Sequence, residues 1–131
     1  MRVLLDTNAY TALFRGHTEV ARIVRQSEEV LFSPIVAGEL LFGFRNGTRY
    51  EANRREMDAF LDNPFVRKLE LTMVTADRFG RLAAALRKKG RPVPSNDLWI
   101  AAQAMETGAD LLSFDRHFAE IDGLAWVLPE E

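Results

Sequence analysis

The sequence predicts an α/β fold in which a parallel sheet is covered by helices on both faces. Short apolar runs alternate with longer segments of helical spacing along all 131 residues. Strands that are buried on both faces are apolar throughout, and parallel neighbours need a crossover connection that is usually a helix. The length suits one core, so we expect residues 1–131 to form a single domain.

The first elements are a strand, two helices and a second strand. Residues 3–5 (Val-Leu-Leu) form a short apolar run that indicates a buried strand. Residues 7–15 and 18–27 are expected to be helical, the latter because its apolar side chains recur at helical spacing. Residues 30–32 (Val-Leu-Phe) repeat the apolar pattern of the first strand.

The middle of the chain predicts two helices and an edge strand. Ser33 followed by Pro34 is typical of a helix start, so a helix should run from there to about residue 45, before Asn-Gly. A second helix is expected over residues 50–61, before Asp-Asn-Pro. Residues 66–71 form a third strand, and their three charged side chains favour the edge of the sheet.

Two longer helices and two strands complete the fold. Helices are expected over residues 75–89 and 96–107, with stops at Gly90 and Gly108, and Ser95 is a suitable cap for the second. The remaining expected elements are strands at 111–113 and 125–128 and a short helical turn at 116–120.

Four acidic residues lie where the surrounding sequence is apolar. They are Asp6, Glu39, Asp97 and Asp115. Asp6 ends the first strand and Asp115 follows the fourth, and sites in such sheets form beyond the carboxyl ends of strands where the strand order reverses. A carboxylate in apolar surroundings costs several kcal/mol unless a cation or donors compensate. Taken together, the four acids predict one metal-holding pocket.

Each acid also has a structural explanation. Asp6 and Asp115 can cap helices, and Asp97 can act as a favourable charge in a first helical turn. Glu39 shares its helix face with apolar residues, which points it at the interior or a cleft, where a buried ion pair with an arginine is the alternative. His17 and His117 have no partner at metal-ligand spacing, and we interpret both as surface or packing residues.

The composition restricts the chemistry. The chain has no Cys, which excludes disulfides and Cys-based zinc sites and is compatible with a reducing cytoplasm. Oxygen ligands without Cys or paired His favour Mg²⁺ or Mn²⁺. The first residues are too weakly apolar for a signal segment, and the longest apolar stretch, 30–44, contains Ser, Pro and Glu, so we expect no membrane span.

The basic residues are concentrated locally although the net charge is −2. Residues 78–91 carry six Lys or Arg and no acid, and residues 45–55 carry four Arg and one Glu. These stretches are either solvated helix faces or a basic rim around the acidic pocket. Within the first stretch, Arg87, Lys88 and Lys89 are three consecutive basic residues.

Four ordered motifs resemble the PIN domain, and more narrowly VapC-type ribonuclease toxins of type II toxin–antitoxin modules. The motifs are Asp6-Thr7-Asn8, the inward Glu39, Asn96-Asp97 before an apolar helix, and Ser113-x-Asp115-x-x-Phe118. The family more often has Thr at the position of Ser113, which keeps the hydroxyl. The resemblance covers essentially the whole length.

The resemblance implies a three-layer sandwich with a five-stranded parallel sheet of order 3-2-1-4-5. It also implies an endoribonuclease that depends on Mg²⁺ or Mn²⁺ and leaves a 5′-phosphate and a 3′-hydroxyl. The acidic quartet Asp6, Glu39, Asp97 and Asp115 would hold the metal, and Glu39 would bind a second ion or deprotonate the attacking water. Thr7, Asn8, Asn96 and Ser113 would be supporting residues. With RNA as the implied substrate, Arg87, Lys88 and Lys89 are our candidate RNA-binding residues.

The implied partners are an RNA substrate, a cognate antitoxin whose C-terminal segment crosses the site, and a second copy of the chain in a homodimer. The implied location is the cytoplasm. Four aromatic side chains between residues 42 and 60 are either core residues, as aromatics at helical spacing more often are, or a surface that grips the antitoxin; they are Phe42, Phe44, Tyr50 and Phe60.

Two other classes compete with this interpretation. A phosphoacceptor receiver domain would need an Asp after the third strand and a Lys after the last, where this chain has Leu71-Thr72-Met73 and Pro129. The other is a non-catalytic or differently regulated PIN-like module that binds RNA or protein, which loss of an acid would favour.

Overall fold

The computed structural model, which describes residues 1–130, contains a five-stranded parallel sheet with the order β3-β2-β1-β4-β5. Its strands are β1 (Arg2–Leu5), β2 (Glu29–Phe32), β3 (Val66–Lys68), β4 (Asp110–Leu112) and β5 (Trp126–Val127). In β1, Leu4 pairs with Leu31 of β2 on one side and with Leu111 of β4 on the other. The predicted fold class, strand order and central pair β1–β4 are therefore confirmed.

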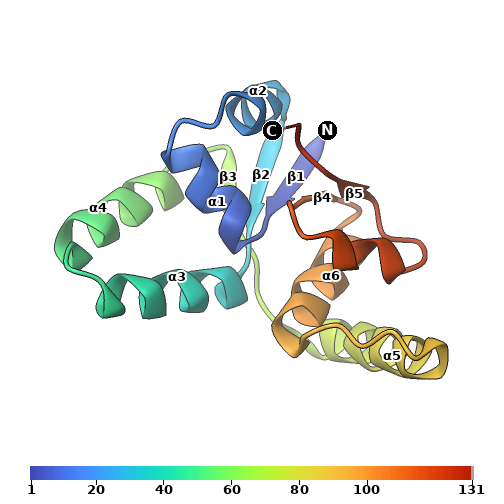
Figure 1. Ribbon diagram of the computed structural model, residues 1–131. Helices are drawn as coiled ribbons and strands as arrows, with labels where there is room; N and C mark the ends of the chain where they lie inside the picture. The colour runs from blue at the N-terminus through green and yellow to red at the C-terminus, as the bar shows by residue number, and fades with distance from the viewer. Residues whose placement is uncertain (131) are drawn as a thin grey trace.

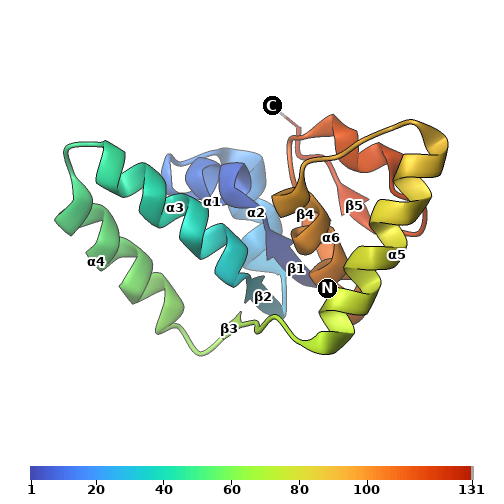
Figure 2. The same ribbon diagram turned by 90° about the horizontal axis from the view of Figure 1, so that it is seen from below.

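Six helices cover the two faces of the sheet (Figures 1 and 2). They are α1 (Thr7–Phe14), α2 (Thr18–Gln26), α3 (Pro34–Asn46), α4 (Tyr50–Leu61), α5 (Met73–Lys89) and α6 (Ser95–Thr107). Helices α1 to α4 lie on one side, and α5 and α6 pack together on the other. A 3₁₀ helix, η1 (Arg116–Glu120), connects β4 to β5. The chain leaves β1 and β4 in opposite directions across the sheet, which places the reversal between these two strands.

Several helix ends follow the expected chemistry. The Ser33 hydroxyl accepts a hydrogen bond from the Ile35 amide at 3.1 Å, and Pro34 is the first residue of α3. Gly90 and Gly108 end α5 and α6 with φ values of 69° and 68°. This left-handed conformation suits Gly because it has no Cβ to clash.

Several predicted boundaries were wrong by one to three residues, and three of the differences have a clear local cause. β3 ends at Lys68 rather than residue 71, because beyond the hydrogen bond from the Leu69 amide to the Phe32 carbonyl oxygen the chain turns toward α5. α5 begins at Met73 because Thr72 and Thr75 bond reciprocally as a capping box. α6 begins at Ser95, and Pro94 occupies the cap position predicted for Ser95.

The core is built from the sheet and the helix faces against it. The strands β1, β2 and β4 contribute fully buried Val and Leu side chains, and Phe118 of η1 is 1% exposed. The predicted aromatic grip does not form as one set, because Phe60 packs in this core, edge-on to Tyr10, whereas Phe42 is 69% exposed. No helix in residues 1–130 combines the length and the apolar character needed to cross a membrane.

Candidate active site

Asp6 occupies the first position beyond β1 and has two structural partners. Its Oδ1 accepts a hydrogen bond from the Ala9 amide at 2.9 Å, which caps α1, and its Oδ2 accepts one from the Ser113 hydroxyl beyond β4. The residue is 5% exposed. The capping explanation and the pocket explanation are thus both true of this residue, since one oxygen caps the helix while the other faces β4.

The pKa of Asp6 is raised from 3.8 to about 6, mainly by burial and to a smaller extent by the negative charges of Asp97 and Asp115. The hydrogen bonds from Ser113 and Ala9 act in the opposite direction but do not offset the desolvation. A buried carboxylate with a raised pKa near other acids is typical of a functional site. Here the raised pKa indicates that the pocket favours a bound proton or cation.

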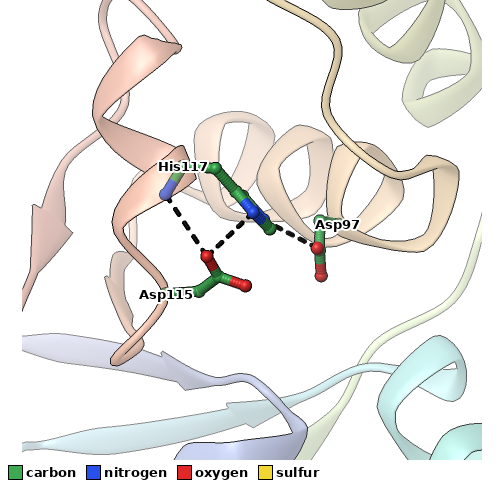
Figure 3. A group of neighbouring side chains, drawn as sticks. All are labelled: Asp97, Asp115 and His117. Atoms are coloured by element: carbon green, nitrogen blue, oxygen red, sulfur yellow. Dashed lines mark hydrogen bonds and ion pairs between the residues drawn. The ribbon is translucent and has the colours of Figure 1, made fainter.

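Asp97, Asp115 and His117 form a compact cluster above β1 and β4 (Figure 3). The Nε2 of His117 lies 2.7 Å from Oδ2 of Asp97, and its Nδ1 lies 2.8 Å from Oδ1 of Asp115. Nε2 is shielded from solvent and makes no hydrogen bond within residues 1–130, and its close contact with Asp97 is an ion pair only when the imidazole is protonated.

The interpretation of His117 as a surface or packing residue was therefore wrong. Its partner Asp97 belongs to a different helix, so the contact arises only from the tertiary fold and spacing along the chain gave no signal for it. His17, by contrast, serves a structural purpose, because its Nδ1 accepts a hydrogen bond from the Val20 amide at 3.2 Å and caps α2.

Ser113 connects two of the acids. Its hydroxyl donates to Asp6, and the same oxygen accepts a hydrogen bond from the Asp115 amide at 3.0 Å. The Asp115 carboxylate caps η1 by accepting from the His117 amide at 3.3 Å. The carboxyl ends of β1 and β4 are thereby joined through one buried hydroxyl.

Asp97 lies in the first turn of α6 and faces this cluster. Burial raises its pKa, His117 lowers it, and the negative charges of Asp115 and Glu39 raise it again. Glu39 is therefore close enough to interact electrostatically with Asp97. Asn96, which precedes Asp97, is exposed and lines a shared pocket with Thr7 and Glu39.

Glu39 is half-buried at a cleft between α1 and α3. The prediction that its side chain points at a cleft is therefore confirmed, and the alternative that it points into the protein interior is wrong. Phe42, an apolar residue on the same face of α3 as Glu39, is exposed to solvent. The apolar neighbours of Glu39 in the sequence therefore predicted more burial than this side chain has. Its Oε1 accepts a hydrogen bond from the Thr7 hydroxyl at 2.6 Å, and no arginine pairs with it among residues 1–130. Thr7 therefore orients Glu39 from the residue next to Asp6.

The remaining candidates lie outside the cluster. Asn8 is exposed at the start of α1. Arg87, Lys88 and Lys89 are exposed at the end of α5, and the Lys89 ammonium donates to the Glu120 carbonyl oxygen at 2.6 Å. This contact gives Lys89 a structural partner, which Arg87 and Lys88 lack among the described residues.

The side chains present fit a divalent cation. One ligand atom each from Asp97, Asp115 and His117 lies within 4.8 Å of the others, and Asp6 adds a desolvated carboxylate whose charge interacts with both acids. Carboxylate oxygens suit Mg²⁺ and Mn²⁺, and an imidazole nitrogen is better tolerated by Mn²⁺. A cation here would offset the repulsion among the acids.

Comparisons with known proteins agree with this geometry. The PIN domain profile matches residues 3–124. The chain is 30% identical to ribonuclease VapC1 of Haemophilus influenzae, with 96% of each chain covered, and 32% identical to ribonuclease VapC19 of Mycobacterium tuberculosis, with 88% and 90% covered.

Solved structures share the fold. A structure of VapBC-1 from nontypeable Haemophilus influenzae superposes with a TM-score of 0.86 at 29% identity and covers 98% of both chains. A structure of VapBC2 from Rickettsia felis bound to a promoter DNA fragment also has a TM-score of 0.86, at 24% identity, over 99% of this chain and 100% of that one. On the match over residues 3–124 and the identity to VapC ribonucleases, the chain belongs to the PIN domain family.

Proposed function

We propose that this protein is a metal-dependent endoribonuclease and the toxin of a type II toxin–antitoxin module. The observation that carries the proposal is the convergence of Asp6, Asp97 and Asp115 from β1, α6 and the end of β4. The similarity to ribonucleases VapC1 and VapC19 supports RNA as the substrate. We also propose that residues 1–131 form a single domain and that the protein acts in the cytoplasm.

Asp6, Asp97 and Asp115 are the residues that would hold Mg²⁺ or Mn²⁺. When bound, such an ion supplies an activated water and neutralises negative charge that develops on the phosphate. The Ser113 hydroxyl bonds both the Asp6 carboxylate and the Asp115 amide and so fixes their relative positions. His117 lies between the carboxylates of Asp97 and Asp115 and holds them at a fixed separation.

Glu39 is the candidate general base. Its carboxylate is half-exposed at the cleft, and the Thr7 hydroxyl donates to Oε1 at 2.6 Å, which leaves Oε2 free to accept a proton from water. Asn96 lines the same pocket as Glu39 and Thr7, where its amide can orient the substrate. Arg87 and Lys88 supply positive charge for the RNA backbone.

A cognate antitoxin is the proposed protein partner, by similarity to the VapBC structures. A cavity of about 530 Å³ between α1, α3 and α4 is available for it. Tyr10, Phe14 and Phe44 give the cavity apolar surface, Arg15 and Arg49 give it positive charge, and Glu39 lies on its wall. An antitoxin segment bound here would reach the proposed base, and we also propose a homodimer as the assembled form.

The direct test is cleavage of labelled RNA by the purified protein with Mg²⁺ or Mn²⁺ and with EDTA. We expect cleavage with the ion and none with EDTA, and no cleavage by Asp6→Asn. Tight RNA binding without cleavage in any ion would instead favour the non-catalytic module. Cleavage that is undiminished in Asp6→Asn would contradict the proposal.

A further inference from the structure

A second pocket lies beside the acidic cluster, on the side of the α1–α2 turn. Its volume is about 560 Å³. The lining comes from the start and end of α1, the turn that follows it and the residue after Ser113; it consists of Asn8, Thr11, Ala12, Arg15, Gly16, His17 and Phe114. Phe114 precedes Asp115, and Asn8 is two residues beyond Asp6. Because consecutive Cα atoms are about 3.8 Å apart, the Cα atoms of Asn8 and Phe114 lie no more than about 8 Å from those of Asp6 and Asp115, respectively.

The wall of this pocket is an aromatic pair. The rings of His17 and Phe114 have centroids 5.2 Å apart and an interplanar angle of 65°. The His17 ring is fixed because its Nδ1 accepts from the Val20 amide, and Phe114 packs against the core between two residues that are themselves hydrogen-bonded. Both side chains are partly exposed. They form a rigid aromatic surface that a ligand can reach.

The polar groups around the aromatic pair suit a nucleotide. Arg15 and Asn8 are exposed, and within residues 1–130 their side chains have no ion pair or hydrogen bond. No lining residue is acidic, in contrast to the neighbouring cluster. A guanidinium can contact a phosphate, and an amide can hydrogen-bond a base edge. Aromatic faces stack on unpaired bases, and this is how proteins commonly hold single-stranded RNA.

We propose that the aromatic pair of His17 and Phe114 is a stacking site for one unpaired RNA base next to the phosphate that is cleaved. This inference rests on the proposed ribonuclease function and adds a feature of the substrate. A paired base cannot leave its duplex to stack here without a cost of a few kcal/mol, so the site selects single-stranded loops or ends. The stacked base, with Arg15 on its phosphate, would place the neighbouring phosphate at the acids.

The test measures RNA binding and cleavage together. A short unpaired RNA with 2-aminopurine at one position is titrated with protein in Ca²⁺, and cleavage is followed in parallel in Mg²⁺. Stacking quenches the fluorescence of the base at the bound position. We expect Phe114→Leu to abolish the quenching and weaken binding about tenfold. His17→Asn, which preserves the cap on α2, should show a smaller loss.

The control is Phe65→Leu, which alters an aromatic side chain that is 47% exposed before β3 and should leave binding unchanged. A double-mutant cycle adds a second criterion. It combines Phe114→Leu with an RNA that has an abasic nucleotide at the position whose fluorescence is quenched on binding. If the base stacks on Phe114, removing the base costs the wild type about tenfold and costs Phe114→Leu almost nothing.

The outcomes separate this inference from the proposed function. Normal quenching and affinity in Phe114→Leu, or equal abasic penalties in both proteins, would overturn the stacking site while cleavage stands. Failure of the wild type to bind or cleave RNA would overturn both. Thermal melts of each variant show that a loss of binding is not a loss of folding.

Discussion

His117 and Asp97 are in contact within the active-site cluster, with 2.7 Å between Nε2 of His117 and Oδ2 of Asp97. Asp97 comes from the first turn of α6 and His117 from η1, so the contact joins the helical layer to the carboxyl end of β4. The other ring nitrogen faces Asp115 at 2.8 Å. A single imidazole therefore separates two carboxylates that would otherwise repel one another.

Replacing His117 should destabilise the metal-free protein more than the metal-bound one. In His117→Gln the repulsion between Asp97 and Asp115 is no longer offset, so we expect the melting temperature in EDTA to fall by about 3 to 5 °C, which corresponds to about 1 kcal/mol. Added Mn²⁺ should restore most of this difference. Differential scanning fluorimetry with and without Mn²⁺ measures it, and His17→Asn is the matched histidine control. An equal loss with and without the ion would contradict the role assigned to His117.

The raised pKa of Asp6 predicts how stability depends on pH. Between its ordinary value of 3.8 and about 6, the folded metal-free protein holds a proton that the unfolded chain has released. The contribution of Asp6 to stability is therefore fully present below about pH 4 and is lost as the pH rises to about 6. The full difference corresponds to about 3 kcal/mol in the free energy of unfolding.

Urea denaturation in EDTA from pH 4 to pH 7 measures this dependence. Asp6→Asn removes the titrating group and keeps an acceptor for the Ala9 amide, so its profile should be flatter than that of the wild type. Identical profiles for the two proteins would show that the titration of Asp6 does not control stability in this range.

The hydrogen bond from Thr7 to Glu39 predicts a loss of activity without a large loss of stability. Thr7→Val keeps the side-chain shape and removes the donor, so Glu39 loses its orientation. We expect cleavage to fall about tenfold and stability by about 1 kcal/mol. Thr107→Val is the matched control, since it lies at the end of α6 and its hydroxyl donates to the Gln103 carbonyl oxygen at 2.7 Å. Similar cleavage rates in the two variants would argue against a catalytic role for the Thr7–Glu39 pair.

The basic end of α5 predicts a salt-dependent contribution to RNA binding. Arg87→Gln with Lys88→Gln removes two exposed charges without disturbing the contact of Lys89 with Glu120. The slope of log affinity against log salt should fall by about 1.4 for single-stranded RNA. Arg22→Gln with Arg25→Gln on α2, which covers the other side of the sheet, is the charge-matched control. If the two double variants have the same salt dependence, Arg87 and Lys88 do not contact the RNA and belong to a solvated helix face.

Much of the fold could be predicted from local patterns. The apolar runs of β1, β2 and β4 are buried on both faces, so their hydrophobicity alone identified them, and Gly90 and Gly108 ended two helices as expected. The prediction made the short edge strand β3 too long because residues 69–71 form no further strand pairs with β2. The strand order came from the resemblance to PIN domains, since no local pattern specifies which strands are neighbours.

The site was less predictable for the same reason. Asp6 and Asp115 could be expected to meet because parallel strand ends share an edge, but the position of His117 between Asp97 and Asp115 depends on how η1 packs against α6. The helical pattern around Glu39 indicated burial, whereas within one turn of α3 the side chains change from buried, at Leu40, to exposed, at Phe42. Contacts between elements, unlike periodicity within one, leave no signature in a single sequence.

Calorimetric titration with Mn²⁺ tests the central claim most directly, because it reports the metal site without relying on an RNA substrate. We predict saturable binding to the wild type, loss of at least tenfold in affinity for Asp97→Asn, and wild-type binding for Asp122→Asn, whose carboxylate is exposed and contacts Lys89 instead. Equal Mn²⁺ affinity in the wild type and Asp97→Asn, or no binding to the wild type, would contradict the account of the acids as a metal-holding nuclease site.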